Sequence, residues 1–148
     1  MSLDVVVVGS CNLDFVVNVD AIPLVGQTVL GGDLAQIPGG KGANQAVATS
    51  RLGYSSAFIG RIGDDNNGKF LKHCLQEDNV NTSFLFETEA VPSGIAMIAV
   101  QADGDNSIVV SPGANARLIP EDVEIFNVIP PSLDKMNSIN INYKIKIA

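Results

Sequence analysis

Short continuous apolar runs alternate with helical apolar stripes along the first half of the chain. Residues 4–9 contain four consecutive valines before a glycine, and residues 56–62 form a second apolar run. Runs that are apolar at successive positions are typical of strands buried on both faces of a parallel sheet. The first run therefore predicts a central strand, the second predicts another buried strand, and residues 82–86 are a further strand candidate.

Two segments carry apolar positions at helical spacing. Residues 43–52 repeat small and apolar side chains up to Gly53, a residue type that commonly follows the last turn of a helix. The apolar face of the second segment, residues 67–78, consists of Phe70, Leu71, Cys74 and Leu75. A short third helix is expected to begin at Pro120, because proline fits the first turn. Strands and helices in this alternation predict an α/β fold.

Shorter and more polar runs predict a separate antiparallel flap. Its expected strands are residues 15–19, 27–30, 34–37, 95–102 and 107–111. The last two flank an Asp-Gly pair, which favours the tight turn of a hairpin. We expect these strands to form a small β-sheet lid with segments at about residues 15–37 and 95–111.

The composition changes near the end of the chain. Residues 137–148 consist mostly of Asn, Ile and Lys, with isoleucines alternating with polar residues. The alternation fits an amphipathic edge strand, whereas the biased composition fits a segment foreign to the preceding domain. We divide the sequence into a domain at residues 1–124 and a divergent tail at residues 125–148, and both interpretations of the tail stay open.

Composition and charge narrow the classes of function. The chain has 148 residues, 46% of them hydrophobic and 17% charged, which suits one domain with a buried core. Its net charge of -7 disfavours nucleic acid and anionic membranes as partners. No apolar run approaches the roughly 20 residues that span a bilayer, and no export signal is visible at the start. Cys11 and Cys74 are expected to be free thiols in a reducing cytoplasm.

Asn12 and Asp14 directly follow the first predicted strand. Ligands of open α/β sheets bind outside the carboxyl ends of the strands. An amide both donates and accepts hydrogen bonds, and a carboxylate accepts from two neighbouring hydroxyls, so the pair suits a polyol. The alternative is that both residues shape the turn between the strand and the flap.

A glycine turn at residues 39–42 precedes the first predicted helix. Glycines let a ligand approach the backbone, and the N–H groups of a first helical turn attract oxygen atoms or negative charge. The turn is not a Walker A loop, because Lys41 is followed by Gly42 rather than Ser or Thr. It is not a dinucleotide fingerprint either, because Gln45 stands in place of the last glycine. A plain glycine-rich helix start is the alternative.

Taken in order, these motifs resemble the signature of the ribokinase-like carbohydrate kinases. The matching segments are Gly9-Ser10-Cys11-Asn12-Leu13-Asp14, Gly39-Gly40-Lys41-Gly42-Ala43-Asn44-Gln45-Ala46, Arg51-Leu52-Gly53, Gly63-Asp64-Asp65, Ser93-Gly94 and Gly113-Ala114-Asn115. The resemblance covers about residues 4–124 and is closer to the ribokinase branch than to the adenosine kinase or fructokinase branches. It implies the N-terminal part of a three-layer α/β sandwich, with a small β-sheet lid over a sugar site.

The resemblance also implies the roles of individual residues. The implied sugar contacts are Asn12, Leu13, Asp14, Gly40, Lys41, Gly42, Ala43 and Asn44. The implied apolar wall of the lid is formed by Ala96, Ile98 and Val110, and the alternative is that these residues form the ordinary core of the lid sheet. By the same resemblance, the activity is ATP-dependent phosphorylation of D-ribose to ribose 5-phosphate with Mg²⁺, in a homodimer formed through the lid. Another sugar or a nucleoside is the alternative substrate.

The part of the family pattern that carries catalysis does not occur in this sequence. Family members have a Gly-Ala-Gly-Asp motif whose aspartate is the general base, and this chain has no such motif. Residues 125–131 also lack the carboxylate that the family places after a core strand. We therefore expect no catalytic residue, no metal site and no productively bound ATP or Mg²⁺ in this chain. The alternative class is a catalytically inactive sugar-binding or dimerisation module.

Overall fold

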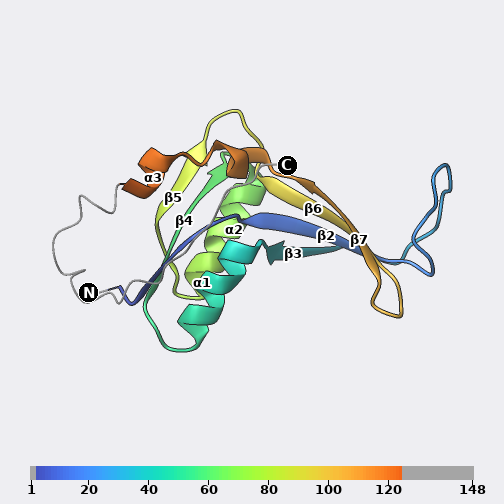
Figure 1. The fold of residues 1–148 in the computed structure, drawn as a ribbon, viewed down its shortest axis with the longest axis horizontal. Helices are drawn as coiled ribbons and strands as arrows, with labels where there is room; N and C mark the ends of the chain where they lie inside the picture. The colour runs from blue at the N-terminus through green and yellow to red at the C-terminus, as the bar shows by residue number, and fades with distance from the viewer. Residues whose placement is uncertain (1–2, 125–148) are drawn as a thin grey trace.

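The structure is a computed structural model that describes residues 3–124. These residues form a parallel sheet with helices on both faces and a second sheet that extends away from it (Figure 1). The arrangement confirms the expected α/β class with a β-sheet lid. The expectations for the tail at residues 125–148 lie outside the described residues.

The parallel sheet contains β1 (Val5–Val8), β4 (Ser56–Gly63) and β5 (Asn81–Thr88), in the order β1-β4-β5. Every residue of β4 except Arg61 is buried. The prediction that residues 4–9 form the central strand is wrong for the described part of the chain, where β4 is central and β1 pairs with β4 alone. A continuous apolar run reports the burial of strand faces and carries no information about strand order.

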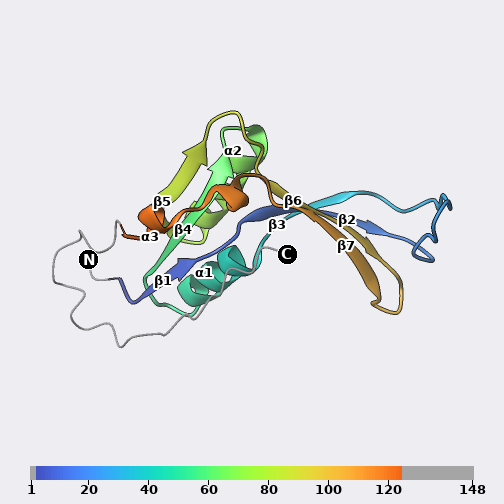
Figure 2. The ribbon, with the colours of Figure 1, turned by 45° about the horizontal axis from the view of Figure 1, so that its top comes forward.

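Helices α1 (Lys41–Arg51) and α2 (Asn66–Glu77) lie on one face of this sheet (Figure 2). The core cluster between the helices and the sheet includes Phe58, Ile62, Leu71 and Leu75. Phe58 is fully buried and is the largest side chain that the core encloses completely. Its ring occupies space left by Gly42 and Gly60, where a Cβ would lie 3.1 Å and 2.6 Å from ring atoms.

The opposite face carries the 3-10 helix η1 (Gly113–Arg117) and α3 (Pro120–Glu124), which confirms the helix expected at Pro120. Arg61 of β4 donates to both carboxylate oxygens of Asp122, at 2.6 Å from Nε and 2.7 Å from Nη2. Its guanidinium carbon lies 5.6 Å from the centre of the Phe86 ring. Arg61 therefore holds α3 against the sheet and completes the third layer of the sandwich.

Local signals set the ends of the two long helices. Gly53 follows α1 with a φ of +90°, a conformation that favours glycine and stops the helix. Asp65 precedes α2 and accepts a hydrogen bond from the N–H of Gly68 at 2.8 Å. Both predicted helices are confirmed, with boundaries that differ by one or two residues. No helix within residues 3–124 is long and apolar enough to cross a membrane.

The second sheet is the predicted lid. Its strands, in spatial order, are β3 (Ala35–Gly39), β2 (Asn12–Asn18), β6 (Gly94–Val100) and β7 (Asn106–Ser111). β6 and β7 form the predicted hairpin, and Gly104 in its turn has a φ of +94°. β2 begins only a few residues after β1, so the chain passes directly from the parallel sheet into the lid.

Two expectations about the lid are wrong. The lid is not wholly antiparallel, because β2 and β6 run parallel to each other. Residues 27–30 are not a strand; they lie in the long connection between β2 and β3, which extends away from the body in Figure 1. This connection pairs through one isolated bridge, between Val19 and Gly31. Strand formation requires a hydrogen-bonding neighbour, which a local sequence pattern does not reveal.

Candidate functional site

The carboxyl end of β1 and the glycine turn meet at one place. A Cβ at Gly40 would lie 2.6 Å from the Ser10 oxygen and 2.9 Å from the Cys11 Cα, so the two backbones are in close contact. Gly40 also has a φ of +95°, which favours glycine. The Ala43 N–H donates to the Ser10 oxygen at 3.2 Å. The fold thus brings together the two motifs that the sequence analysis singled out.

Asp14 lies on β2, opposite Ile37 of β3 and Ala96 of β6. A Cβ at Gly39 would overlap its carboxylate, so Gly39 provides the space that the carboxylate occupies. The Asp14 Oδ1 is buried and has no hydrogen-bond partner within residues 3–124. Burial raises the pKa of Asp14 above its ordinary value. A buried acceptor without a partner typically costs about 1–3 kcal/mol, so this oxygen indicates a site for an external donor.

Asn12 is two residues before Asp14 and therefore faces the same side of β2. It pairs with Gly39 of β3 and Gly94 of β6. The Asn12 Oδ1 accepts a hydrogen bond from the Nδ2 of Asn115 at 2.8 Å. Asn115 belongs to a segment that matches the family, but its role cannot be predicted from the sequence because its partner lies 103 positions away.

The other implied sugar contacts differ in exposure. Leu13 is 1% exposed and belongs to the core cluster, so its side chain packs the strand on the face opposite the polar pair. Gly42 and Ala43 are also buried, beneath the first turn of α1. Lys41 and Asn44 are exposed on the same turn. Of the turn residues, these two have side chains free to reach a ligand.

The residues of the implied lid wall share one face of the lid. Ala96 pairs with Asp14 on β2 and with Val110 on β7. Ile98 is two residues further along β6 and faces the same side. Ala96 is 4% exposed and Val110 is 54% exposed, so the wall is covered near Asp14 and open at β7. The strand register therefore places an apolar surface beside the carboxylate.

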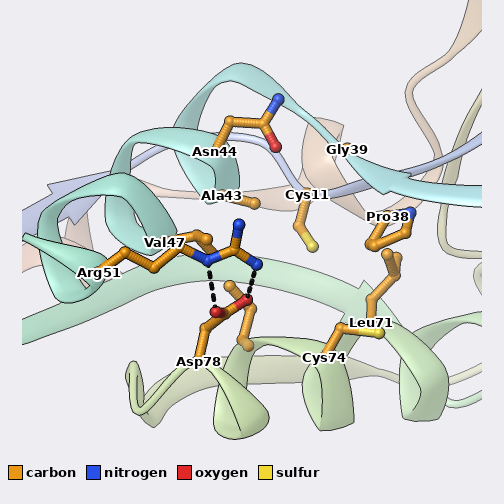
Figure 3. Close-up of a pocket in the computed structure, with 11 residues that line it drawn as sticks. Cys11, Pro38, Gly39, Ala43, Asn44, Val47, Arg51, Leu71, Cys74 and Asp78 are labelled. Carbon is orange, nitrogen blue, oxygen red and sulfur yellow. Dashed lines mark hydrogen bonds and ion pairs between the residues drawn. The ribbon is translucent and has the colours of Figure 1, made fainter.

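A cavity of about 180 Å³ lies between α1 and α2, behind the glycine turn (Figure 3). Cys11 and Cys74 both line it, and the ion pair between Arg51 Nε and Asp78 Oδ1, 2.6 Å apart, borders it. Both cysteines are free thiols, as expected. Burial raises the pKa of Cys11 to about 12, so this thiol stays protonated at neutral pH. The cavity lies on the core side of β2, away from the face that carries Asp14.

The described residues thus combine a parallel sheet, a β-sheet lid and the polar pair Asn12 and Asp14 on the lid strand that follows β1. The sequence pattern of the pfkB family carbohydrate kinases matches residues 2–132, which extends past the boundary expected at residue 124. The chain belongs to the pfkB family of carbohydrate kinases.

Within this family, the chain is most clearly similar to ribokinases. It is 45% identical to the ribokinase of Bacillus subtilis (strain 168) over 117 residues, which are 79% of this chain and 40% of that protein. It is 40% identical to the ribokinase of Dictyostelium discoideum over 124 residues, which are 84% of this chain and 39% of that protein. The structure of Arabidopsis thaliana ribokinase complexed with ribose and ATP superimposes with a TM-score of 0.71 at 35% identity, covering 84% of this chain and 42% of that one. The chain therefore spans about 40% of the length of these relatives.

Proposed function

We propose that this chain carries the sugar-binding and lid part of a ribose kinase. The observation that carries the proposal is the buried, unpartnered Oδ1 of Asp14, on the same face of β2 as Asn12. A sugar hydroxyl can donate to this oxygen and accept from an amide. The similarity to ribokinases supports D-ribose as the sugar. Another sugar or a nucleoside is the alternative substrate.

The proposed site takes its contacts from three elements. Asn12 and Asp14 of β2 bind hydroxyls, and Lys41 and Asn44 of α1 reach the same ligand from the glycine turn. The backbone N–H groups of Gly40 to Asn44 add donors at the helix start. The apolar lid face beside Asp14 covers the carbon skeleton of the sugar and excludes water.

The whole kinase would use ATP and Mg²⁺ to convert ribose to ribose 5-phosphate. The glycine turn lacks the Ser or Thr that follows the lysine of a Walker A loop, and residues 3–124 contain no group of three or more His, Cys, Asp or Glu that could hold a metal ion. Nucleotide and metal are proposed to bind in the part of the relatives that this chain does not span. The proposed compartment is the cytoplasm, where free thiols such as Cys11 and Cys74 are usual.

Titration of the chain with D-ribose tests the sugar site. We expect binding by isothermal titration calorimetry, and a loss of about tenfold to a hundredfold in affinity for Asp14→Asn, because the amide cannot accept two hydroxyl protons as the carboxylate does. The matched control is Asp33→Asn, which makes the same change at an exposed position in the connection between β2 and β3. Equal ribose affinity in the chain and in the Asp14→Asn variant would contradict the assignment of the site.

The same substitution is expected to stabilise the unliganded chain at neutral pH. Burial raises the pKa of Asp14 above its ordinary value near 3.8, so the folded chain holds this proton more tightly than the unfolded chain. The stability that protonated Asp14 contributes is therefore lost as the pH rises from about 4 through the raised pKa. Asp14→Asn should show a higher urea midpoint than the unsubstituted chain at pH 7, with the difference disappearing below pH 3.8. A lower midpoint at pH 7 would contradict this expectation.

We also propose that the chain forms a homodimer through the lid. The lid face opposite Asp14 carries an apolar groove that is lined by Phe15, Val17, Ile95, Met97 and Val109, among others. Met97 is 49% and Val109 is 59% exposed, and apolar sheet surfaces of this kind tend to pair. Sedimentation velocity should show a dimer that Met97→Glu dissociates, whereas Leu52→Glu, at an exposed position after α1, leaves it intact. A monomer at micromolar concentration would contradict the proposal.

A further inference from the structure

Asn115 connects η1 to the start of β2 through three hydrogen bonds. Its Oδ1 accepts from the N–H of Cys11 at 2.9 Å. Its Nδ2 donates to the carbonyl oxygen of Cys11 at 3.1 Å and to the Oδ1 of Asn12 at 2.8 Å. Because Nδ2 carries two protons, both are in use.

These contacts determine which way both amides point. The Cys11 N–H can only donate and its carbonyl can only accept, so the oxygen and nitrogen of the Asn115 amide cannot exchange places. The Asn115 nitrogen must then face an acceptor, which assigns Oδ1 of Asn12 to the contact. The Nδ2 of Asn12 is directed away from it, and no hydrogen bond to this nitrogen is found among the described residues.

The surrounding backbone leaves little room for another arrangement. A Cβ at Gly94 would overlap the Asn115 Nδ2 and would lie 2.5 Å from the Asn12 Oδ1, so the amide contact depends on the missing side chain. η1 itself is held in place because Ala114 is fully buried and its N–H donates to the Pro92 oxygen at 2.8 Å. The Asn115 side chain is therefore held in place by the backbone of η1 and by the contacts of its amide.

We propose that Asn115 is a positioning residue that presents Asn12 to the ligand as a hydrogen-bond donor, beside Asp14 as an acceptor. The inference rests on the proposed sugar site and gives a structural reason for the selectivity of that site. A ligand must offer an acceptor to the Asn12 Nδ2 and a donor to the Asp14 Oδ1, and hydroxyl groups supply both. The pair therefore selects neighbouring hydroxyls, as in a sugar, over ligands that carry only donors or only acceptors at this position.

Asn115→Asp tests this role with almost no change in shape. One carboxylate oxygen still accepts from the Cys11 N–H, but the other can no longer donate and meets the Asn12 Oδ1. The Asn12 amide is expected to flip, so that its nitrogen points at the new carboxylate and its oxygen points at the ligand. Asn66→Asp is the matched control, because it makes the same atomic and charge change at an exposed position on α2.

The orientation of Asn12 can be measured without any ligand. In the ¹⁵N-labelled chain, the Asn115 Nδ2 protons should show strong nuclear Overhauser effects to the Gly94 Hα, and the Asn12 Nδ2 protons only weak ones. In Asn115→Asp the Asn12 Nδ2 protons should gain the strong effect. Strong effects from the Asn12 Nδ2 protons to the Gly94 Hα in the unsubstituted chain would overturn the proposal, whether or not the variant folds.

Ribose titration separates this proposal from the proposed function. We expect Asn115→Asp to bind D-ribose about tenfold to a hundredfold more weakly, and Asn66→Asp to bind it like the unsubstituted chain. Equal binding by Asn115→Asp overturns the positioning role while leaving the ribose site intact. No ribose binding by any of the three chains, together with the expected nuclear Overhauser pattern, rejects ribose as the ligand and supports the orientation that Asn115 gives to Asn12.

Discussion

Incubated with D-ribose, ATP and Mg²⁺, the purified chain is expected to release no ADP above background. A general base within hydrogen-bond reach of the attacking hydroxyl contributes about 100- to 10,000-fold in rate, and the Gly-Ala-Gly-Asp motif expected to supply it does not occur in this sequence. The inferred role of Asp14 is to hold sugar hydroxyls. Positioning of the two substrates together accounts for a further 7–11 kcal/mol or so of the barrier, and the chain spans only about 40% of the length of the kinases that it matches.

A coupled assay of ADP release, with the Bacillus subtilis ribokinase as the positive control, measures this directly. The Asp14→Asn variant, purified in parallel, distinguishes the chain from contaminating host kinase. Turnover that requires ribose and disappears in Asp14→Asn would contradict the expectation and would mean that the chain contains a base and a nucleotide site of its own. Turnover that is equal in both preparations belongs to the contaminant.

Phe58→Ala is expected to cost about 3–5 kcal/mol of the free energy of unfolding. Its ring is fully buried beneath α1 and is in close contact with Gly42 and Gly60, two residues without side chains that could move to fill the space. Since single domains are stable by about 5–15 kcal/mol, this loss removes a large fraction of the total. It also loosens the first turn of α1, which carries Lys41 and Asn44 of the proposed site.

Urea denaturation followed by circular dichroism measures this cost. Phe70→Ala is the matched control, because Phe70 lies on α2 with 41% of its surface exposed and should lose only about 1 kcal/mol or less. Similar losses for the two variants would show that the ring of Phe58 does not anchor the core in the way that the packing indicates.

The sequence predicted the parts of the fold whose signals are local. The helix stop at Gly53, the helix start at Pro120 and the hairpin at Gly104 each involve neighbouring residues, and the structure contains all three. The central place of residues 4–9 in the sheet and the wholly antiparallel lid were predicted wrongly, because both depend on contacts between distant segments. The strand predicted at residues 27–30 is wrong for the same reason.

The residues of the proposed site likewise include some that a local pattern suggests and others that only the structure connects. Asn12 and Asp14 were predicted from their place after a strand, and the register of the lid places Ala96 beside them. Leu13 was included with its neighbours, although alternation along a strand turns it into the core. Asn115 lies 104 positions from Cys11, so no spacing rule connects the two. Gly94 allows that contact because it has no side chain, and this role can be recognised only from the structure.

The direct passage of β1 into β2 has a mechanical consequence. Asn12 and Asp14 belong to the lid, whereas Lys41 and Asn44 belong to a helix packed on the parallel sheet. A ligand that contacts both pairs spans the boundary between two bodies, and its affinity depends on the angle between them. Rotation of the lid about residues 9–11 would move the carboxylate while the glycine turn stays in place. If the proposed site is correct, the strand that contacts the sugar is also the part that moves when the sugar binds.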